Sequence, residues 1–177
     1  MIEGALARRL DLGLRRQIPL ATALLAVQLD LLPVPDPSPQ SLAPFATLCV
    51  VYYWGVYRPD LMTPLATFVI GLTLDLLAGG PLGFNALILT LAVGLMAPRQ
   101  KALVAASPLV IWLCFGLLAL VVAVVRWLVA SLWWGRLFAL EPLLYETGLT
   151  VVLYPLASAL LTRLQARLPR IGHASGS

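Results

Sequence analysis

The sequence predicts an all-α integral membrane protein with six transmembrane helices. Three observations support this fold class: an apolar composition, six separate apolar runs, and an asymmetry of basic residues between alternate connections. Of the 177 residues, 60% are hydrophobic and 11% are charged, and the mean hydropathy is +0.93. A water-soluble domain carries about 25% charged residues. Because this chain lacks the polar surface that a globule in water requires, we expect lipid to be its solvent.

The six apolar runs differ in length. A helix of 16 residues, the length of the second and fourth runs, reaches only ~24 Å into a hydrocarbon core ~30 Å thick. Short crossings are tolerated where neighbouring helices shield their ends, so we expect the middle of the chain to form the interior of the bundle. Residues 126–140 are too polar and too short to cross, and are predicted to form an interfacial helix or a wrapped loop. The runs cover residues 18–32, 42–57, 61–78, 82–97, 104–125 and 143–161.

Basic residues predict the direction of the crossings. With the N-terminus in the cytoplasm, the cytoplasmic segments hold ten basic residues, whereas the outer segments hold only Arg126 and Arg136. Cytoplasmic loops of membrane proteins carry such an excess, so both termini are expected to be cytoplasmic. The ten are Arg8, Arg9, Arg15, Arg16, Arg58, Arg99, Lys101, Arg163, Arg167 and Arg170. The chain then divides into a basic cytoplasmic N-terminal segment (1–17), a six-helix transmembrane domain (18–162) and a basic, disordered cytoplasmic tail (163–177).

The turn after the second run has two open interpretations. Pro59 suits the first turn of the third helix, where its missing N–H costs nothing, and Arg58 can reach the lipid headgroups. A tight cytoplasmic turn and a partner-binding segment both fit these residues. The end of the second run carries four aromatic residues that are predicted to form an interfacial belt: Tyr52, Tyr53, Trp54 and Tyr57.

Asp75 is the most unusual polar residue, because it lies within hydrocarbon depth near the outer end of the third run. An acid inside a membrane is a candidate functional site by default. A structural role is equally open, in which Asp75 caps backbone donors or pairs within the bundle. Its candidate partners are Asn85, Arg126 and Arg136. We further hypothesise that the polar residues of the outer third form one cluster with an outer arginine: Asp30, Asp75, Asn85 and Glu146.

Glycines indicate close packing and a tight turn. Gly71 and Gly94 lie inside apolar runs, where a small residue lets helices approach closely. Gly79, Gly80 and Gly83 allow positive φ angles in the hairpin that joins the third and fourth runs.

No sequence motif indicates catalysis, a cofactor or a metal. The single histidine, His173, lies in the tail, and no zinc-binding pattern, phosphate-binding loop or nucleophile elbow is present. Cys49 and Cys114 are isolated and are interpreted as small hydrophobic residues. The net charge of +4 is interpreted as a topology signal rather than a nucleic-acid signal.

A short set of motifs resembles the rod shape-determining protein MreD family. The set consists of the Arg58-Pro59 turn, then Gly71-Leu72 with Asp75-Leu76, then Pro81-Leu82-Gly83. The specific part covers about 30 residues, and the six short spans extend the likeness over nearly the whole chain. The resemblance implies a multi-pass protein of the bacterial inner membrane, with a fold similar to the substrate-binding component of ECF-type vitamin transporters. It assigns no catalytic residue. The matching positions Arg58, Pro59, Gly71, Asp75, Pro81 and Gly83 are therefore expected to serve the fold or partner contacts.

Two functions follow from the resemblance and the residues. The first is a non-enzymatic scaffold of the cell-wall elongation complex that binds MreC, beside MreB, RodA and a class-B penicillin-binding protein. The alternative is a membrane component that binds a small molecule or a lipid-linked wall precursor in an outward-facing cavity. Such a cavity would lie near Asp75, Asn85 and Glu146, and Arg126 and Arg136 could meet a pyrophosphate there.

Overall fold

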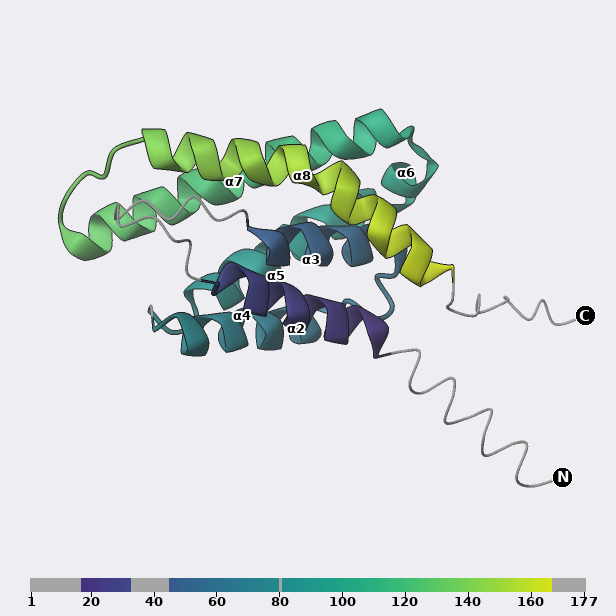
Figure 1. Ribbon diagram of the computed structural model, residues 1–177, viewed down its shortest axis with the longest axis horizontal. Helices are drawn as coiled ribbons and strands as arrows, with labels where there is room; N and C mark the ends of the chain where they lie inside the picture. Colours follow the sequence, from purple (N-terminus) through teal and green to yellow (C-terminus); the bar gives the residue numbers. More distant parts are fainter. Residues whose placement is uncertain (1–16, 33–44, 80, 167–177) are drawn as a thin grey trace, which may run out of the picture.

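The computed structural model describes residues 17–32, 45–79 and 81–166, and every regular element in this part of the chain is helical. Six helices run back and forth along one axis (Figure 1). They are α2 (Ile18–Asp30), α3 (Ala46–Tyr57), α4 (Pro64–Ala78), α5 (Phe84–Met96), α7 (Pro108–Trp134) and α8 (Glu141–Gln165). A 3-10 turn, η1 (Ala97–Arg99), and the short helix α6 (Gln100–Ala105) extend α5.

Three helical segments are long and apolar enough to cross a membrane by length and composition. They are Phe84–Ala105, Pro108–Trp134 and Glu141–Gln165, while α2, α3 and α4 are shorter apolar helices. The all-helical class predicted from the sequence is therefore confirmed for the described residues. The tail predicted to begin at residue 163 is helical through Gln165. Residues 167–177 lie outside the described residues, as does nearly all of the segment 1–17.

Helix α3 lies at the centre of the bundle and packs against α2, α5, α6 and α8 (Figure 1). All ten of its residues from Thr47 to Val56 are buried. The short second run is thus interior, as expected. The fourth run differs from that expectation, because α5 buries one face and exposes Leu87, Leu91 and Leu95 on the other.

The predicted interfacial belt is wrong for three of its four aromatic residues. Tyr52, Tyr53 and Trp54 are at most 1% exposed and belong to the core. Each polar tip has a partner inside the protein, so burial leaves no donor unsatisfied. The Tyr52 hydroxyl donates to the Ile111 carbonyl (2.9 Å), the Tyr53 hydroxyl donates to Gln165 Oε1 (2.5 Å), and Trp54 Nε1 donates to Thr22 Oγ1 (2.9 Å).

The α7–α8 hairpin extends well beyond the other helices at one end (Figure 1). Helix α7 has 27 residues and α3 has 12, which correspond to ~40 Å and ~18 Å at 1.5 Å per residue. The predicted interfacial segment 126–140 is not separate, because α7 continues without a break to Trp134 and only the remainder forms a loop.

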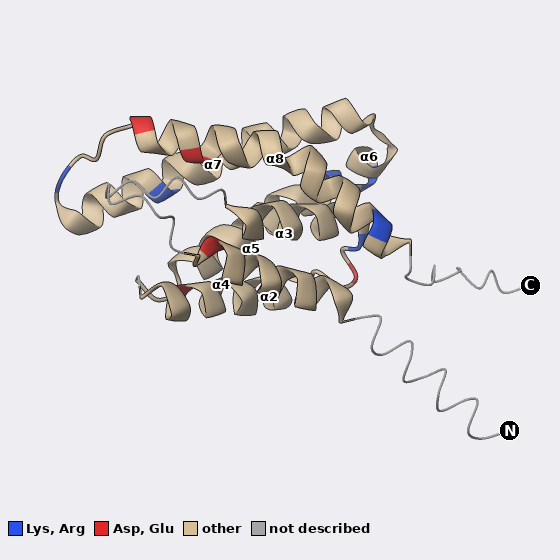
Figure 2. Ribbon diagram, in the orientation of Figure 1, with Lys and Arg blue, Asp and Glu red and all other residues tan. Residues whose placement is uncertain are grey.

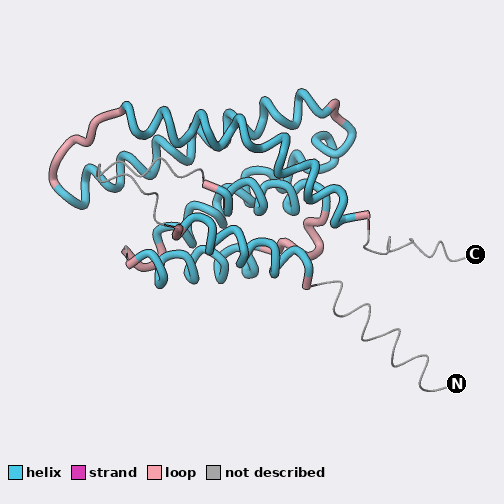
Figure 3. The backbone as a smooth tube through the Cα atoms, in the orientation of Figure 1, coloured by secondary structure: helices cyan, strands magenta, loops and turns pink. Residues whose placement is uncertain are grey.

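Helix α8 bends near its middle, where it contains Pro155 (Figure 3). Proline has no N–H, so the carbonyl four residues earlier, that of Val151, loses its helical partner. Trp112 of α7 replaces that partner, because its Nε1 donates to the Val151 carbonyl at 2.9 Å. The bend is therefore compatible with burial in lipid, where backbone groups need a partner inside the protein.

We expect Trp112→Phe to lower the free energy of unfolding by about 1–2 kcal/mol, because it leaves the Val151 carbonyl without a donor. Thermal unfolding of the purified protein in detergent measures the change. Trp134→Phe is the matched control, since Trp134 is 53% exposed at the end of α7. Equal losses in the two variants would contradict the role of Trp112.

Charged residues separate toward the two ends of the bundle (Figure 2). The end where α3 stops and α6 begins, here the basic end, carries Arg58, Arg99, Lys101 and Arg163 together with Asp60, which pairs with Arg58. The opposite end, where α2 and α4 stop and α3, α5 and α8 begin, is here the acidic end. It carries Asp30, Asp75, Glu141 and Glu146 together with Arg126 and Arg136. This is the separation that the sequence predicted for these residues. Which end faces the cytoplasm stays a prediction.

Candidate functional site

Asp75 caps the N-terminus of the neighbouring helix. Its Oδ1 accepts the Asn85 backbone N–H at 3.0 Å and the Asn85 side-chain amide at 2.8 Å, and its Oδ2 accepts the Ala86 N–H at 3.3 Å. Both backbone donors lie in the first turn of α5, whose N–H groups have no partner within the helix. The capping position of α5 itself is Gly83, which has no side chain. Asp75 therefore supplies from α4 the acceptor that the α5 sequence lacks.

Burial and electrostatics agree with this arrangement. Asp75 is 1% exposed, so an unpaired carboxylate there would carry a large desolvation cost. The N-terminus of α5 offers the positive end of a helix dipole to the carboxylate, which offsets the negative C-terminal end of α4. Of the two roles left open by the sequence, the geometry favours the capping role.

Gly71 brings α4 and α5 close enough for this cap. A Cβ atom built at Gly71 would lie 2.5 Å from the Ala86 nitrogen and 2.8 Å from the Asn85 carbonyl carbon. A Cβ atom cannot approach backbone atoms this closely, so only glycine fits where α4 and α5 cross. Gly71 and Asp75 are four residues apart and lie on one face of α4. We call Gly71, Asp75, Asn85 and Ala86 the α4–α5 clamp.

The turn between the two helices also depends on glycine. Gly79 ends α4 with a φ of 68° and Gly83 begins α5 with a φ of 88°, both in the left-handed region that other residues avoid. The Pro81 carbonyl accepts the Phe84 N–H at 3.3 Å. The positive φ angles predicted for the hairpin are confirmed at Gly79 and Gly83, and Gly80 lies outside the described residues.

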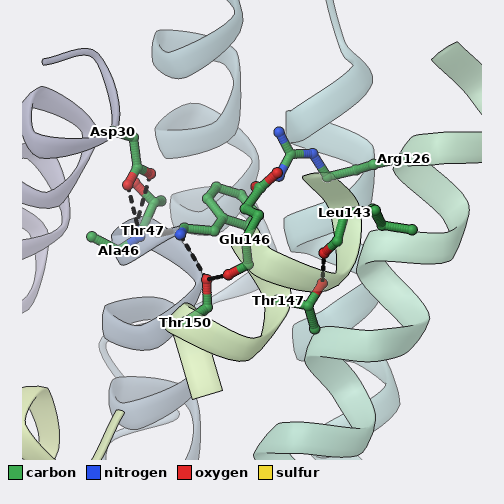
Figure 4. Close-up of polar contacts among 9 residues, drawn as sticks. Asp30, Ala46, Thr47, Arg126, Leu143, Glu146, Thr147 and Thr150 are labelled. Carbon is green, nitrogen blue, oxygen red and sulfur yellow. Dashed lines mark hydrogen bonds and ion pairs between the residues drawn. The ribbon is translucent and has the colours of Figure 1, made fainter. Parts of the chain in front are cut away.

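A second acid, Asp30, caps a neighbouring helix in the same way, between α2 and α3 (Figure 4). Asp30, the last residue of α2, accepts the Ala46 N–H at 2.7 Å and the Thr47 N–H at 3.1 Å. Thr150 of α8 accepts the Phe45 N–H at 2.9 Å. The α3 N-terminus is thus capped by side chains from two other helices. The sequence placed Asp30 near the end of the first apolar run, where α2 ends, but gave no signal for this role.

Glu146 and Arg126 form an ion pair between α8 and α7 (Figure 4). Arg126 Nη1 lies 2.5 Å from Glu146 Oε1, and the two side chains are 32% and 25% exposed. The Arg126 guanidinium also lies 4.7 Å from the centre of the Phe45 ring. The Thr150 hydroxyl donates to the Glu146 carbonyl at 2.6 Å. These contacts connect the α7–α8 hairpin to the capped end of α3.

The hypothesis of one polar cluster differs from the structure. Among the described residues, the contacts of Asp75 and Asn85 belong to the α4–α5 clamp, whereas Glu146 and Arg126 belong to the network around α3. Neither Arg126 nor Arg136 pairs with Asp75: Arg126 pairs with Glu146, and the Arg136 guanidinium lies 4.7 Å from the centre of the Phe138 ring. The structure does bring Asn85 against Asp75.

The Arg58-Pro59-Asp60 segment forms a closed turn at the basic end. Arg58 Nε and Nη2 donate to the two Asp60 carboxylate oxygens at 3.1 and 3.2 Å. The expectation that Pro59 starts the third helix is wrong, because α4 begins at Pro64 and Thr63 caps it by accepting the Ala66 N–H at 3.2 Å. The polar side chains of the turn satisfy each other locally.

Within the described residues, no group of three or more His, Cys, Asp or Glu side chains could hold a metal ion. Cys49 is buried in α3 and Cys114 is exposed on α7. His173 lies outside the described residues.

Comparison with known proteins identifies the family. No curated protein and no solved structure matches the chain, so the likeness to the vitamin-transporter component stays a prediction. A family model described as rod shape-determining protein MreD matches residues 14–164, a range that includes the α4–α5 clamp and, of the helices in the described part of the chain, everything except the last residue of α8. Because the match spans most of the chain, this protein belongs to the rod shape-determining protein MreD family.

Proposed function

We propose that this chain is a non-enzymatic scaffold subunit of the bacterial cell-wall elongation complex and that it binds MreC in the inner membrane. Family membership supplies the coarse function, which is determination of rod shape by a membrane protein. The observation that carries the rest is that the acids at the ends of α2 and α4 serve as helix caps. Asp30 and Asp75 both accept backbone N–H groups of neighbouring helices, so their carboxylates support the fold rather than a reaction.

The lipid-exposed helix faces are the proposed contact surface. Leu76 of α4, Leu117 of α7 and Val152 of α8 are 63%, 66% and 68% exposed, and each belongs to a largely apolar helix. Helices associate in lipid by close packing and a few polar contacts. A single-span partner such as MreC can dock on one such face, and its periplasmic part would connect the scaffold to RodA and a class-B penicillin-binding protein. MreB would be reached from the cytoplasmic side.

We expect MreC to co-purify with the tagged chain after solubilisation in a mild detergent, and depletion of the chain to round the cells. Tryptophan substitutions at Leu76, Leu117 and Val152 test three separate faces, and each variant controls for the other two. The variant on the docking face should lose MreC while the other two retain it. A parent chain that purifies without MreC, and whose depletion leaves cell width unchanged, would contradict the proposal.

The alternative function, ligand binding at the acidic end, is favoured by one observation. A pocket of about 520 Å³ opens between α7, α8 and the loop that joins them, and Arg126 and Arg136 both line it.

A further inference from the structure

We propose that this pocket binds the phosphate group of an anionic lipid, an inference that rests on the alternative function above and is independent of MreC binding. The pocket is lined by Phe84 at the start of α5, by Arg126, Trp127 and Ala130 of α7, by residues 136–139 of the loop, and by Pro142, Leu143 and Glu146 of α8. Its volume of about 520 Å³ falls within the range of ligand sites, ~300–1,000 Å³. We call it the α7–α8 pocket.

The pocket lies at the depth of lipid phosphates. Helix α7 starts at Pro108 near the basic end and reaches Arg126 eighteen residues later, a rise of ~27 Å. A hydrocarbon core is ~30 Å thick, so a helix that enters the core near Pro108 brings Arg126 to the opposite boundary. With the basic end in the cytoplasm, this boundary belongs to the outer leaflet. Lipid headgroups, rather than free solutes, are then the most concentrated anions beside the pocket.

Both arginines are held in place by their surroundings. Arg126 is fixed by Glu146 and by the Phe45 ring. Arg136 follows Gly135, which ends α7 with a φ of 62°, and the Arg136 backbone N–H donates to the Ser131 carbonyl at 3.2 Å. The loop is further fixed because Trp127 Nε1 donates to the Phe138 carbonyl at 3.0 Å. A guanidinium whose position is set before binding loses less freedom when it pairs with a phosphate.

The charge of the lining matches one anion. Arg126 and Arg136 contribute two positive charges and Glu146 one negative charge, which leaves a formal charge of +1. The phosphodiester of a phospholipid such as phosphatidylglycerol carries one negative charge and restores neutrality. Guanidinium groups bind phosphate oxygens with paired N–H donors, and basic pockets between transmembrane helices recognise anionic headgroups. The remaining lining is largely apolar, with Phe84, Ala130, Leu137, Phe138 and Leu143 among it, and suits the glycerol and upper acyl chain.

Native mass spectrometry of the full chain in detergent tests the proposal. The probes are phosphatidylglycerol, phosphatidylcholine with the same acyl chains, and a polyprenyl diphosphate. We expect phosphatidylglycerol to bind more tightly than phosphatidylcholine, and Arg136→Gln to weaken that binding about tenfold, since it removes a charge-assisted contact. Arg99→Gln is the matched control, because it removes the same charge at the basic end, where the Arg99 guanidinium donates one hydrogen bond among the described residues, to the Leu95 carbonyl.

Each outcome has a defined meaning. Preferential binding of phosphatidylglycerol or of the polyprenyl diphosphate over the zwitterionic phosphatidylcholine, if it depends on Arg136 and not on Arg99, supports the site, and the tighter of the two anionic lipids identifies the source of the phosphate. Equal binding of phosphatidylglycerol and phosphatidylcholine, with no preference for the diphosphate, overturns the proposal. Equal losses in R136Q and R99Q also overturn it. If the chain shows no preference for the anionic lipids but MreC still co-purifies, the lipid-site proposal fails and the scaffold proposal stands.

Discussion

Asp75→Ala is expected to lower the free energy of unfolding in detergent by about 3 kcal/mol. The substitution removes the acceptor of the Asn85 and Ala86 backbone N–H groups and of the Asn85 side-chain amide. Each buried polar group left without a partner costs about 1–3 kcal/mol. Because Gly83 has no side chain that could replace the cap, the first turn of α5 should fray. Titration with a denaturing detergent measures the stability, and faster hydrogen exchange at Asn85 and Ala86 reports the fraying.

Two variants control for this result. Asp75→Asn keeps one acceptor oxygen, but its amide group faces the backbone N–H that the second carboxylate oxygen accepted. We expect it to lose about half as much unfolding free energy as Asp75→Ala. Asp60→Ala removes a carboxylate that is 46% exposed and pairs locally with Arg58, and surface pairs contribute about 0–1 kcal/mol. Equal losses in D60A and D75A would contradict the cap. A D75N protein that accumulates and unfolds like the parent, yet rounds the cells, would show that the acid contacts a partner instead.

Gly71→Ala should have an effect of similar size, about 3 kcal/mol, although it adds only one methyl group. The new Cβ would occupy the space of the Ala86 and Asn85 backbone, so α5 must move away from α4. That movement also lengthens the bonds to Asp75. The losses of G71A and D75A should therefore not add, and their double-mutant cycle should give a coupling energy of about 0.5–3 kcal/mol.

Gly94→Ala provides the matched control for Gly71→Ala. A Cβ atom at Gly94 meets no atom within 4 Å, so the close packing predicted there is absent in the structure. Alanine forms helix better than glycine by about 1 kcal/mol, and G94A should leave stability unchanged or raise it slightly. If G71A and G94A behaved alike in the same unfolding assay, the close crossing of α4 and α5 would be wrong.

The helices and the positions of the polar residues could be predicted from the sequence, because both depend on local hydropathy. The same pattern located Asp75 near a helix end and Gly79 and Gly83 in a tight turn. The partner of Asp75 could not be predicted, since it depends on how the hairpin aligns α4 with α5. A local signal existed nonetheless: an α-helix that begins at a glycine lacks its own cap, which indicates that another segment must supply one.

The predicted aromatic belt and the predicted interfacial segment at 126–140 failed for the same reason. The chemistry of a side chain alone does not determine where that side chain lies in the bundle. Tyr52, Tyr53 and Trp54 have the amphipathic character of interfacial residues, but partners on α2, α7 and α8 satisfy their polar tips inside the core. Arg126 suggested the end of a crossing, but Glu146 on the adjacent helix pairs with it and lets α7 continue. Neither set of partners is visible before the helices are placed together.

The lipid-facing helices α4 and α7 differ in hydrophobic length. Helix α4, with 15 residues and exposed Leu65, Phe68 and Leu77, presents ~23 Å to acyl chains, whereas α7 presents ~27 Å between Pro108 and Arg126. A bilayer with a core of ~30 Å must thin more beside α4 than beside α7, or the helices must tilt, at a cost of a fraction of a kcal/mol per Å. A neighbouring protein that covers the exposed face of α4 removes the need for the bilayer to thin there. The acyl-chain length of the host membrane should therefore influence which proteins associate with α4.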